Sequence, residues 1–205
     1  SEASEAAAGA ARQIATLDRI LGATQNGAPR MTVNIISSDL PGDKLDSEPR
    51  YRRTVEAMTI LKTLLNGQHL SHKGEFWNFD LDPPRIGTQN GKCPPLYFGG
   101  LSPAAKEAAA EGCDVYLMWP ETVQGAKDLI ADMTARAAKY GRTLKYGFRV
   151  HVVVRETEAQ AREAAGRLLS KLDADTGAAI RAKSLDSQSA GVAHQAELRE
   201  AASAN

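Results

Sequence analysis

The stretch PPLYFGGLSPAAKEAAAEGCDVYLMW, from Pro94 to Trp119, decides the fold. It opens with a short apolar run that ends in two glycines, a pattern typical of a buried strand followed by a tight turn. An alanine-rich segment begins at Ser102 and Pro103, a residue pair common at the N-cap and first position of a helix. A second apolar run, DVYLMW, closes the unit. Strand, helix and strand in this order predict a right-handed βαβ unit with parallel strands.

The same alternation continues on both sides of this unit. Period-two and period-3.6 patterns separate strands from helices. The predicted strands and the hairpin cover MTVNIISS (31–38), QHLSHKGEFWNFDL (68–81, a hairpin around a Lys-Gly turn) and LKYGFRVHVVV (144–154). The predicted helices cover AAAGAARQIATLDRIL (6–21), RYRRTVEAMTILKTLLNG (50–67), ETVQGAKDLIADMTARAAKYG (121–141) and TEAQAREAAGRLLSKL (157–172).

Composition narrows the function classes. Lysine plus arginine and aspartate plus glutamate both total 25, so no basic excess exists to neutralise phosphates, which argues against a nucleic-acid binder. No apolar run is long enough to span a bilayer, and no signal peptide is recognisable. Cys93 and Cys113 match no metal or redox spacing, so we expect thiols in a reducing cytoplasm and no bound metal.

Two architectures fit the alternating pattern. One is an open, doubly wound sheet and the other is part of a (β/α)8 barrel. The chain has 205 residues, whereas a closed barrel typically has about 250. Composition does not choose between the two.

Candidate ligand-binding residues follow the predicted strands. The turn Gly99–Ser102 precedes a helix N-terminus, where free N–H groups favour an anion, although it is also compatible with a tight turn that binds nothing. Asn34 interrupts an apolar strand, and needs a hydrogen-bond partner from the backbone or from a polar ligand. Ser37 lies where that strand ends. Trp119 ends another predicted strand. It is either a core aromatic residue or a residue at a ligand site.

Arg149 and His151 form the most informative pair. Two residues apart on a predicted strand, they project to the same face. A buried guanidinium there suits a bound anion, and an imidazole beside it suits proton transfer. The alternative is a polar strand face turned to solvent or paired with carboxylates. His69, His72 and His194 show no metal spacing and are interpreted as structural or exposed.

Taken together, several stretches resemble the bacterial luciferase-like, flavin-dependent monooxygenase family, in its alkanesulfonate monooxygenase branch. They occur in the family's order from about Ala10 to Leu172, and the resemblance implies a (β/α)8 TIM barrel. The stretches are AARQIATLDRI, TVNIISSD, EPRYRR, CPPLYFGGLSPAAKEAAAE, DVYLMWPET and GRTLKYGFRVHVVVRETEAQA.

The resemblance also implies a chemistry. Members bind reduced FMN delivered by a separate NAD(P)H-dependent flavin reductase, and use it to activate O2 against the substrate. In the alkanesulfonate branch the carbon–sulfur bond is cleaved to an aldehyde and sulfite. Related families use the deazaflavin F420, or oxidise sulfones, hydrocarbons or nitrogen heterocycles. Members commonly form dimers or tetramers.

Carried over residue by residue, the resemblance assigns roles. Arg149 stabilises negative charge on peroxide or sulfonate, His151 handles protons and Trp119 lies near the flavin. Asn34, Ser37 and Tyr51 are expected to contact the flavin. Its phosphate would be held by Gly100, Leu101 and Ser102.

The match corresponds to the central part of such a barrel. We therefore expect residues 1–173 to form an incomplete barrel, and residues 174–205 a mobile loop or loosely packed helices. Loops differ from the alkanesulfonate enzymes, which usually have Gly-Gly-Ser-Ser at 99–102 and Thr-Gly at 37–38. A flavin-binding fragment without turnover is the alternative from another class.

Overall fold

The computed structural model of the 205-residue chain describes residues 24–25, 28–29, 31–37, 45–85, 91–171, 173–184 and 189–203. The helix expected at 6–21, and Ser38 with Asp39, lie outside the described residues. A short antiparallel pair, β1 (Thr24–Gln25) and β2 (Ala28–Pro29), comes first in the described part.

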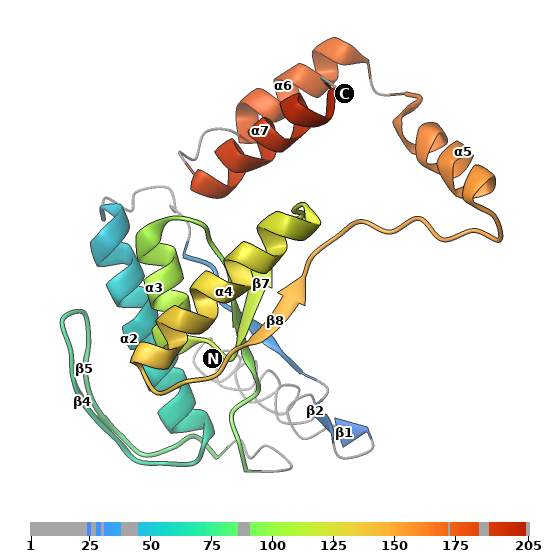
Figure 1. Cartoon of the computed structure of the whole chain (residues 1–205). Coiled ribbons are helices and arrows are strands. Elements are labelled where there is room, and N and C mark those ends of the chain that lie inside the picture. Colours follow the sequence, from blue (N-terminus) through green and yellow to red (C-terminus); the bar gives the residue numbers. More distant parts are fainter. Residues whose placement is uncertain are drawn as a thin grey trace, which may run out of the picture.

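A four-stranded parallel sheet carries the rest of the architecture (Figure 1). Its strands are β3 (Val33–Asn34), β6 (Leu96–Phe98), β7 (Val115–Met118) and β8 (Lys145–Phe148), and they lie side by side in chain order. All three pairings are parallel. A sheet that adds each new strand beside the previous one is wound in a single direction, as in a barrel, and lacks the order reversal of a doubly wound sheet.

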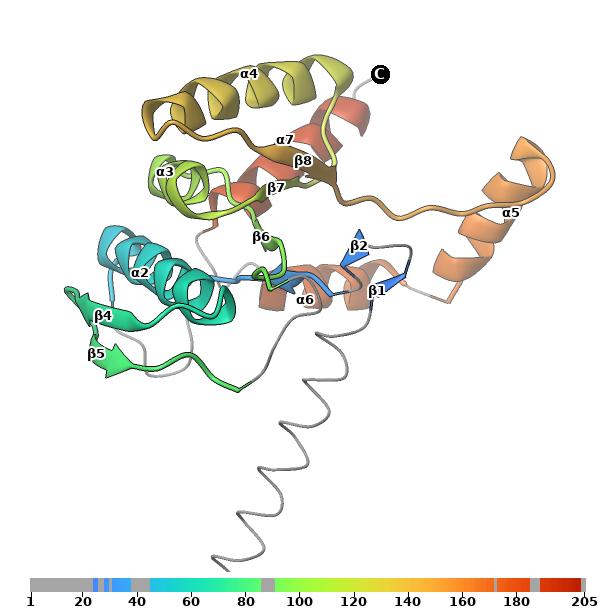
Figure 2. The same ribbon diagram turned by 90° about the horizontal axis from the view of Figure 1, so that it is seen from below.

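Helices connect these strands along one side of the sheet. They are α2 (Ser47–Leu65), α3 (Pro103–Gly112) and α4 (Val123–Lys139), and α3 packs between the other two (Figure 2). α3 begins where the sequence predicts, whereas α2 begins three residues before the predicted start at 50 and α4 two residues after the predicted start at 121. Ser102 caps α3 and Thr122 caps α4, each accepting a hydrogen bond from an amide three residues on.

The core lies between the sheet and these three helices. Small residues on α3 bring it close to α2: a Cβ added at Gly112 would lie 2.3 Å from the methyl carbon of Met58, which lies on α2. Met58 is fully buried, so we expect its truncation to alanine to cost about 2–5 kcal/mol. The core residues include Met58, Leu96, Phe98, Ala105, Ala109, Cys113, Tyr116, Met118, Met133 and Ala137.

The hairpin expected at 68–81 is present as β4 (Leu70–Lys73) and β5 (Asn78–Leu81), an antiparallel pair closed by a turn at 74–77. Glu56 of α2 holds this turn. Its carboxylate accepts hydrogen bonds from the amides of Phe76 at 3.0 Å and Trp77 at 2.8 Å, and it contacts His72 at 2.9 Å.

The prediction of a strand over 144–154 is correct in its first half and wrong in its second half. β8 ends at Phe148, and the next hydrogen bond runs from the amide of Arg149 to the carbonyl of Met118 at 2.8 Å. β7 ends at Met118, so the following backbone has no neighbouring strand among the described residues. Val152 and Val154 are therefore 71% and 73% exposed, although the alternation predicts that their face packs against helices.

Three more helices complete the described chain: α5 (Glu158–Leu169), α6 (Ala174–Ser184) and α7 (Ala190–Ser203). The extended segment after β8 carries α5 away from the sheet, and α6 and α7 follow it in the chain (Figure 1). The expected helix at 157–172 is confirmed and opens with a capping box at Thr157 and Gln160. The division of the chain at residue 173, and the mobility expected beyond it, remain predictions.

Candidate functional site

The carboxyl-terminal edge of the parallel sheet gathers the predicted site residues. Parallel strands end at one edge, so residues that follow different strands meet there. The residues that follow β6 and β7 are the turn at 99–102 and Trp119, and those that follow β8 include Arg149 and His151. Ser37 lies three residues past the end of β3. The edge thus brings polar groups from four strands to one side of the fold.

The turn after β6 packs closely against the first turn of α3. A Cβ added at Gly100 would lie 2.6 Å from the Ala105 side chain, so only glycine fits this position without displacing the helix. Ser102 accepts a hydrogen bond from the Ala105 amide at 3.2 Å, and its own hydroxyl hydrogen remains free to donate. No hydrogen bond in the described chain occupies the amides of Gly100 and Leu101. These groups form the kind of donor set that binds a phosphate.

Buried Tyr116, on the neighbouring strand, holds this turn by a hydrogen bond. Its hydroxyl, on β7, donates a 2.7 Å hydrogen bond to the Gly100 carbonyl. Burial raises the pKa of Tyr116 well above its usual value, and so the phenol stays protonated. The turn is therefore tied both to the neighbouring strand and to the helix that follows it.

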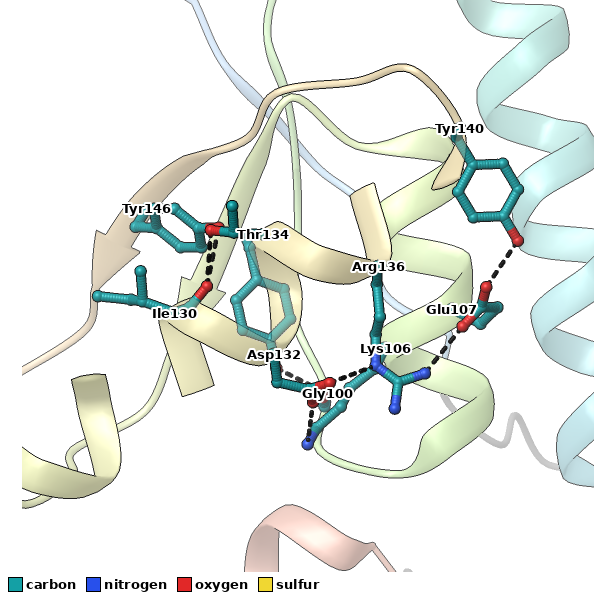
Figure 3. Close-up of polar contacts among 10 residues, drawn as sticks. Gly100, Lys106, Glu107, Ile130, Asp132, Thr134, Arg136, Tyr140 and Tyr146 are labelled. Atoms are coloured by element: carbon teal, nitrogen blue, oxygen red, sulfur yellow. Dashed lines mark hydrogen bonds and ion pairs between the residues drawn. The ribbon is translucent and has the colours of Figure 1, made fainter. Parts of the chain in front are cut away.

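A polar network fixes α3, and with it the turn, against α4 (Figure 3). Asp132 pairs with Lys106 and with Arg136, both at 2.9 Å. Arg136 and Tyr140 also reach Glu107, each at 2.8 Å. The Tyr140 hydroxyl and the Arg136 guanidinium lower the pKa of Glu107 against the opposing effect of burial. All five residues lie on α3, on α4 or, in the case of Tyr140, at the C-cap of α4, so their role is to align the two helices.

Tyr51 reaches the same turn from α2. Its ring packs edge-on against Phe98 with 6.2 Å between centroids, and its hydroxyl oxygen lies 3.9 Å from the position of a Cβ on Gly100. The guanidinium of Arg50 lies over the ring at 5.7 Å. The structure therefore brings together Tyr51, Gly100 and Ser102, which the sequence separates by about fifty residues.

Ser37 presents an unsatisfied polar atom. Its Oγ is buried and has no hydrogen-bond partner among the described residues. A buried hydroxyl without a partner is costly, so a bound polar group would stabilise it. Asn34 differs from the expectation of a buried carboxamide: it is exposed, because it lies on the solvent face of a strand at the sheet edge.

Trp119, Arg149 and His151 are exposed side chains at the ends of β7 and β8. The Arg149 amide bonds to the last residue of β7, which places its backbone one residue from Trp119 along that strand. Within the described chain, neither the Arg149 nor the His151 side chain makes a hydrogen bond or ion pair. The cavity that these two residues were predicted to share remains a prediction.

One pair of residues at this edge escaped sequence reasoning. Glu121 follows Trp119 and Pro120, and its carboxylate, 10% exposed, contacts Nε2 of His194 on α7. The position of Glu121 just beyond a predicted strand was readable, but nothing in the sequence pointed to a partner 73 residues away. His69 and His72 contact carboxylates of the hairpin and α2, and no group in the described chain could hold a metal.

The chain belongs to the luciferase-like monooxygenase family, whose sequence profile matches residues 6–204. It is 62% identical over 193 residues to a sulfoquinovose monooxygenase of Novosphingobium aromaticivorans, covering 94% of this chain and 53% of that protein. It is 48% identical to a sulfoquinovose monooxygenase of Agrobacterium fabrum, covering 94% and 49%. The chain therefore spans about half the length of the curated relatives it matches.

A solved structure supports the same fold. The crystal structure of a long-chain alkane monooxygenase superposes with a TM-score of 0.65 at 21% identity, over 80% of this chain and 44% of that one. The luciferase-like barrel predicted from the sequence is confirmed, and the open sheet agrees with an incomplete barrel. None of the helices in the described chain combines the length and apolarity needed to cross a membrane.

Proposed function

We propose that this chain is the central part of a flavin-dependent monooxygenase that cleaves the carbon–sulfur bond of sulfoquinovose, releasing sulfite and leaving an aldehyde. The observation that carries the flavin assignment is the turn Gly100–Ser102, with its available donors at a helix N-terminus on the carboxyl-terminal edge. The similarity to two sulfoquinovose monooxygenases supports the substrate. This sugar sulfonate replaces the simple alkanesulfonate expected from sequence motifs.

The residues present fit a reduced FMN. The amides of Gly100 and Leu101 and the Ser102 hydroxyl would hold its phosphate, and Tyr51 lines the same turn. The buried Ser37 hydroxyl would gain a partner from the polar part of the flavin. When bound, reduced flavin supplies the activation of O2. The deazaflavin F420 is the alternative cofactor within the same fold.

The remaining residues act on the substrate. Arg149 offers a permanent positive charge with a planar set of donors that suits a sulfonate or a developing oxyanion. His151, on the same side of the extended chain, would hold or transfer a proton at the reacting carbon. Trp119 would supply an apolar wall that keeps water from the reacting atoms. Their exposure here agrees with a site completed by segments outside this chain.

The whole protein would work with partners. We expect a separate NAD(P)H-dependent flavin reductase, a dimeric or tetrameric assembly and a cytoplasmic location, all of which remain predictions. The sulfur chemistry places the enzyme in the degradation of organosulfonates.

The test uses the full-length protein with a flavin reductase, NADH, FMN and O2. We expect sulfite release from sulfoquinovose, and little from hexanesulfonate at the same concentration. Sulfite from hexanesulfonate alone would restore the alkanesulfonate assignment, and no sulfite from either sulfonate would contradict the proposed reaction. Titration with FMN, reduced FMN and F420, followed by fluorescence, would identify the cofactor.

A further inference from the structure

Helix α7 docks on the loop that joins β7 to α4. Two adjacent residues of α7 contact two adjacent residues of this loop: His194 Nε2 meets the Glu121 carboxylate, and the Gln195 side-chain amide donates to the Pro120 carbonyl at 2.7 Å. The loop begins at Trp119, so α7 lies at the carboxyl-terminal end of β7.

The first turn of α7 lies beside the indole of Trp119, which stays 40% exposed. A Cβ added at Gly191 would lie 3.7 Å from both Cε3 and Cζ3 of this ring, an ordinary van der Waals distance. Gly191 precedes His194 by three residues and therefore lies on the same helix face. One face of α7 thus contacts the indole with one residue and the Glu121 carboxylate with another.

The charges at this contact favour a protonated imidazole. His194 faces Glu121 from the loop and, 3.5 Å from Nδ1, Glu197 of its own helix. An imidazolium donates from both ring nitrogens and can satisfy both carboxylates, whereas neutral imidazole donates from only one. Glu121 is further held by the Thr122 amide at 2.8 Å, so its carboxylate stays in place when the imidazole leaves.

We infer that Glu121 and His194 are positioning residues that seat α7 against the Trp119 indole, and that deprotonation of His194 loosens this contact. The consequence for catalysis rests on the function proposed above, since a seated α7 would shield from water the wall of the site formed by Trp119. The seating itself does not depend on that function.

The pH window follows from the two titrating groups. The hydrogen bond to Glu121 raises the pKa of His194 above 6.5 against the opposing effect of burial. The stabilisation that protonated His194 gives to the docked α7 is therefore complete below pH 6.5. It disappears as the pH rises through the higher, folded-state pKa. Burial would raise the pKa of Glu121, but the bonds from His194 and Thr122 lower it below 4.5. The stabilisation that ionised Glu121 gives to the docked α7 is present above pH 4.5 and disappears as the pH falls through that lower pKa.

The test labels the full-length protein with 5-fluorotryptophan and follows the Trp119 resonance by fluorine NMR, assigned with Trp119→Phe. Between about pH 5.5 and about pH 9, we expect this resonance to titrate with a midpoint above the ordinary histidine value. His194→Gln should abolish the titration and speed hydrogen exchange in residues 190–203 several-fold. Gln195→Ala should speed that exchange while leaving the titration in place.

The matched control is His69→Gln, on the β4–β5 hairpin, where His69 also contacts two carboxylates, Asp80 and Asp82. It should change neither the Trp119 resonance nor exchange in α7. A titration that persists in His194→Gln, or a wild-type resonance that does not respond to pH, would overturn the proposal. If Trp119 titrates as expected but no sulfonate yields sulfite, the seating stands and the proposed reaction fails.

Discussion

The hydroxyl of Tyr116 donates a 2.7 Å hydrogen bond to the carbonyl of Gly100, so a side chain inside β7 holds the turn that follows β6. Tyr116 is 1% exposed, and the bond connects the interior of the sheet to the candidate phosphate site. Because β6 and β7 are hydrogen-bonded neighbours, this contact requires the parallel pairing of the two strands. The core and the site are in this way parts of one arrangement.

Tyr116→Phe should remove this bond and leave a buried carbonyl unsatisfied. We expect a loss of about 1 kcal/mol in the free energy of unfolding, together with weaker FMN binding, because the turn is no longer held. Urea unfolding and a fluorescence titration measure the two effects. Tyr146→Phe is the matched control: its hydroxyl contacts Thr134 at 2.6 Å, away from the turn. It should lower stability but leave FMN affinity unchanged; equal FMN affinity in both variants would contradict the prediction.

Gly100→Ala should disturb the turn more strongly. The added methyl group would lie 2.6 Å from the Ala105 side chain, so the turn or the first turn of α3 must shift. We expect a loss of about 1–3 kcal/mol in stability and a marked loss of flavin binding. Gly166→Ala in α5 has nothing within 4 Å of its new methyl group and should stabilise the helix by about 0.5–1 kcal/mol. Unchanged flavin binding in Gly100→Ala would argue against a phosphate site at this turn.

Arg149→Ala should lower the rate of sulfite release by about 10²–10³-fold, the range found when one group that stabilises developing negative charge is removed. Steady-state kinetics with the full-length enzyme measure this loss. Arg149→Lys should recover only part of the rate, since an ammonium lacks the planar donors of a guanidinium. Arg155→Ala is the control. Within the described chain the exposed Arg155 side chain bonds only to the neighbouring carbonyl of Val154, so this variant should retain full activity. Equal rates in the two alanine variants would exclude Arg149 from the site.

Glu56→Gln should loosen the β4–β5 hairpin. The Glu56 side chain is 9% exposed, and its charged form accepts two backbone amides and contacts His72. We expect a loss of about 1–3 kcal/mol in stability and faster hydrogen exchange at the turn 74–77. Glu75→Gln, which breaks the exposed pair with Arg52, should have a smaller effect. Equal losses in the two variants would contradict this ranking.

The pH dependence of the wild-type hairpin provides a second measurement. Burial raises the pKa of Glu56, but the hydrogen bonds from His72, Phe76 and Trp77 lower it by more, so the net pKa lies below 4.5. A carboxylate with a lowered pKa stabilises the fold above its unfolded-state pKa, and this stabilisation disappears as the pH falls through the folded-state value. Protection of the turn amides, after correction for the intrinsic exchange rate at each pH, should therefore fall in acid in the wild type and respond less to acid in Glu56→Gln.

Sequence reasoning succeeded where the signal was local. The strands at 96–98 and 115–118, the cap at Ser102 and the Lys-Gly hairpin all follow from residues adjacent in the chain. Helix caps and hairpin turns depend on a few neighbouring side chains, so their patterns can be recognised without the fold. The motifs, and the order in which they occur along the chain, were enough to predict the family and its barrel.

Sequence reasoning failed where a distant partner decides the outcome. The alternation through Val154 predicted a long strand, but a strand continues only as far as its neighbour, and β7 ends at Met118. Asn34 was expected to need a hydrogen-bond partner within a buried strand, and its side chain is exposed on the outermost strand of the described sheet. The specific roles of Arg149 and His151 were predicted from the resemblance, and both side chains are exposed past the end of β8.

The amino-acid sequence by itself determined the alternation of strands and helices, the capped turn after β6 and the family, because these depend on side chains close together in the chain. Only the tertiary structure decided that Tyr116 holds Gly100, that Tyr51 reaches the same turn and that His194 meets Glu121. Each of these contacts joins different strands or helices, and its existence depends on how those elements pack. Backbone pairing and helix docking set such distances, and no local pattern encodes them.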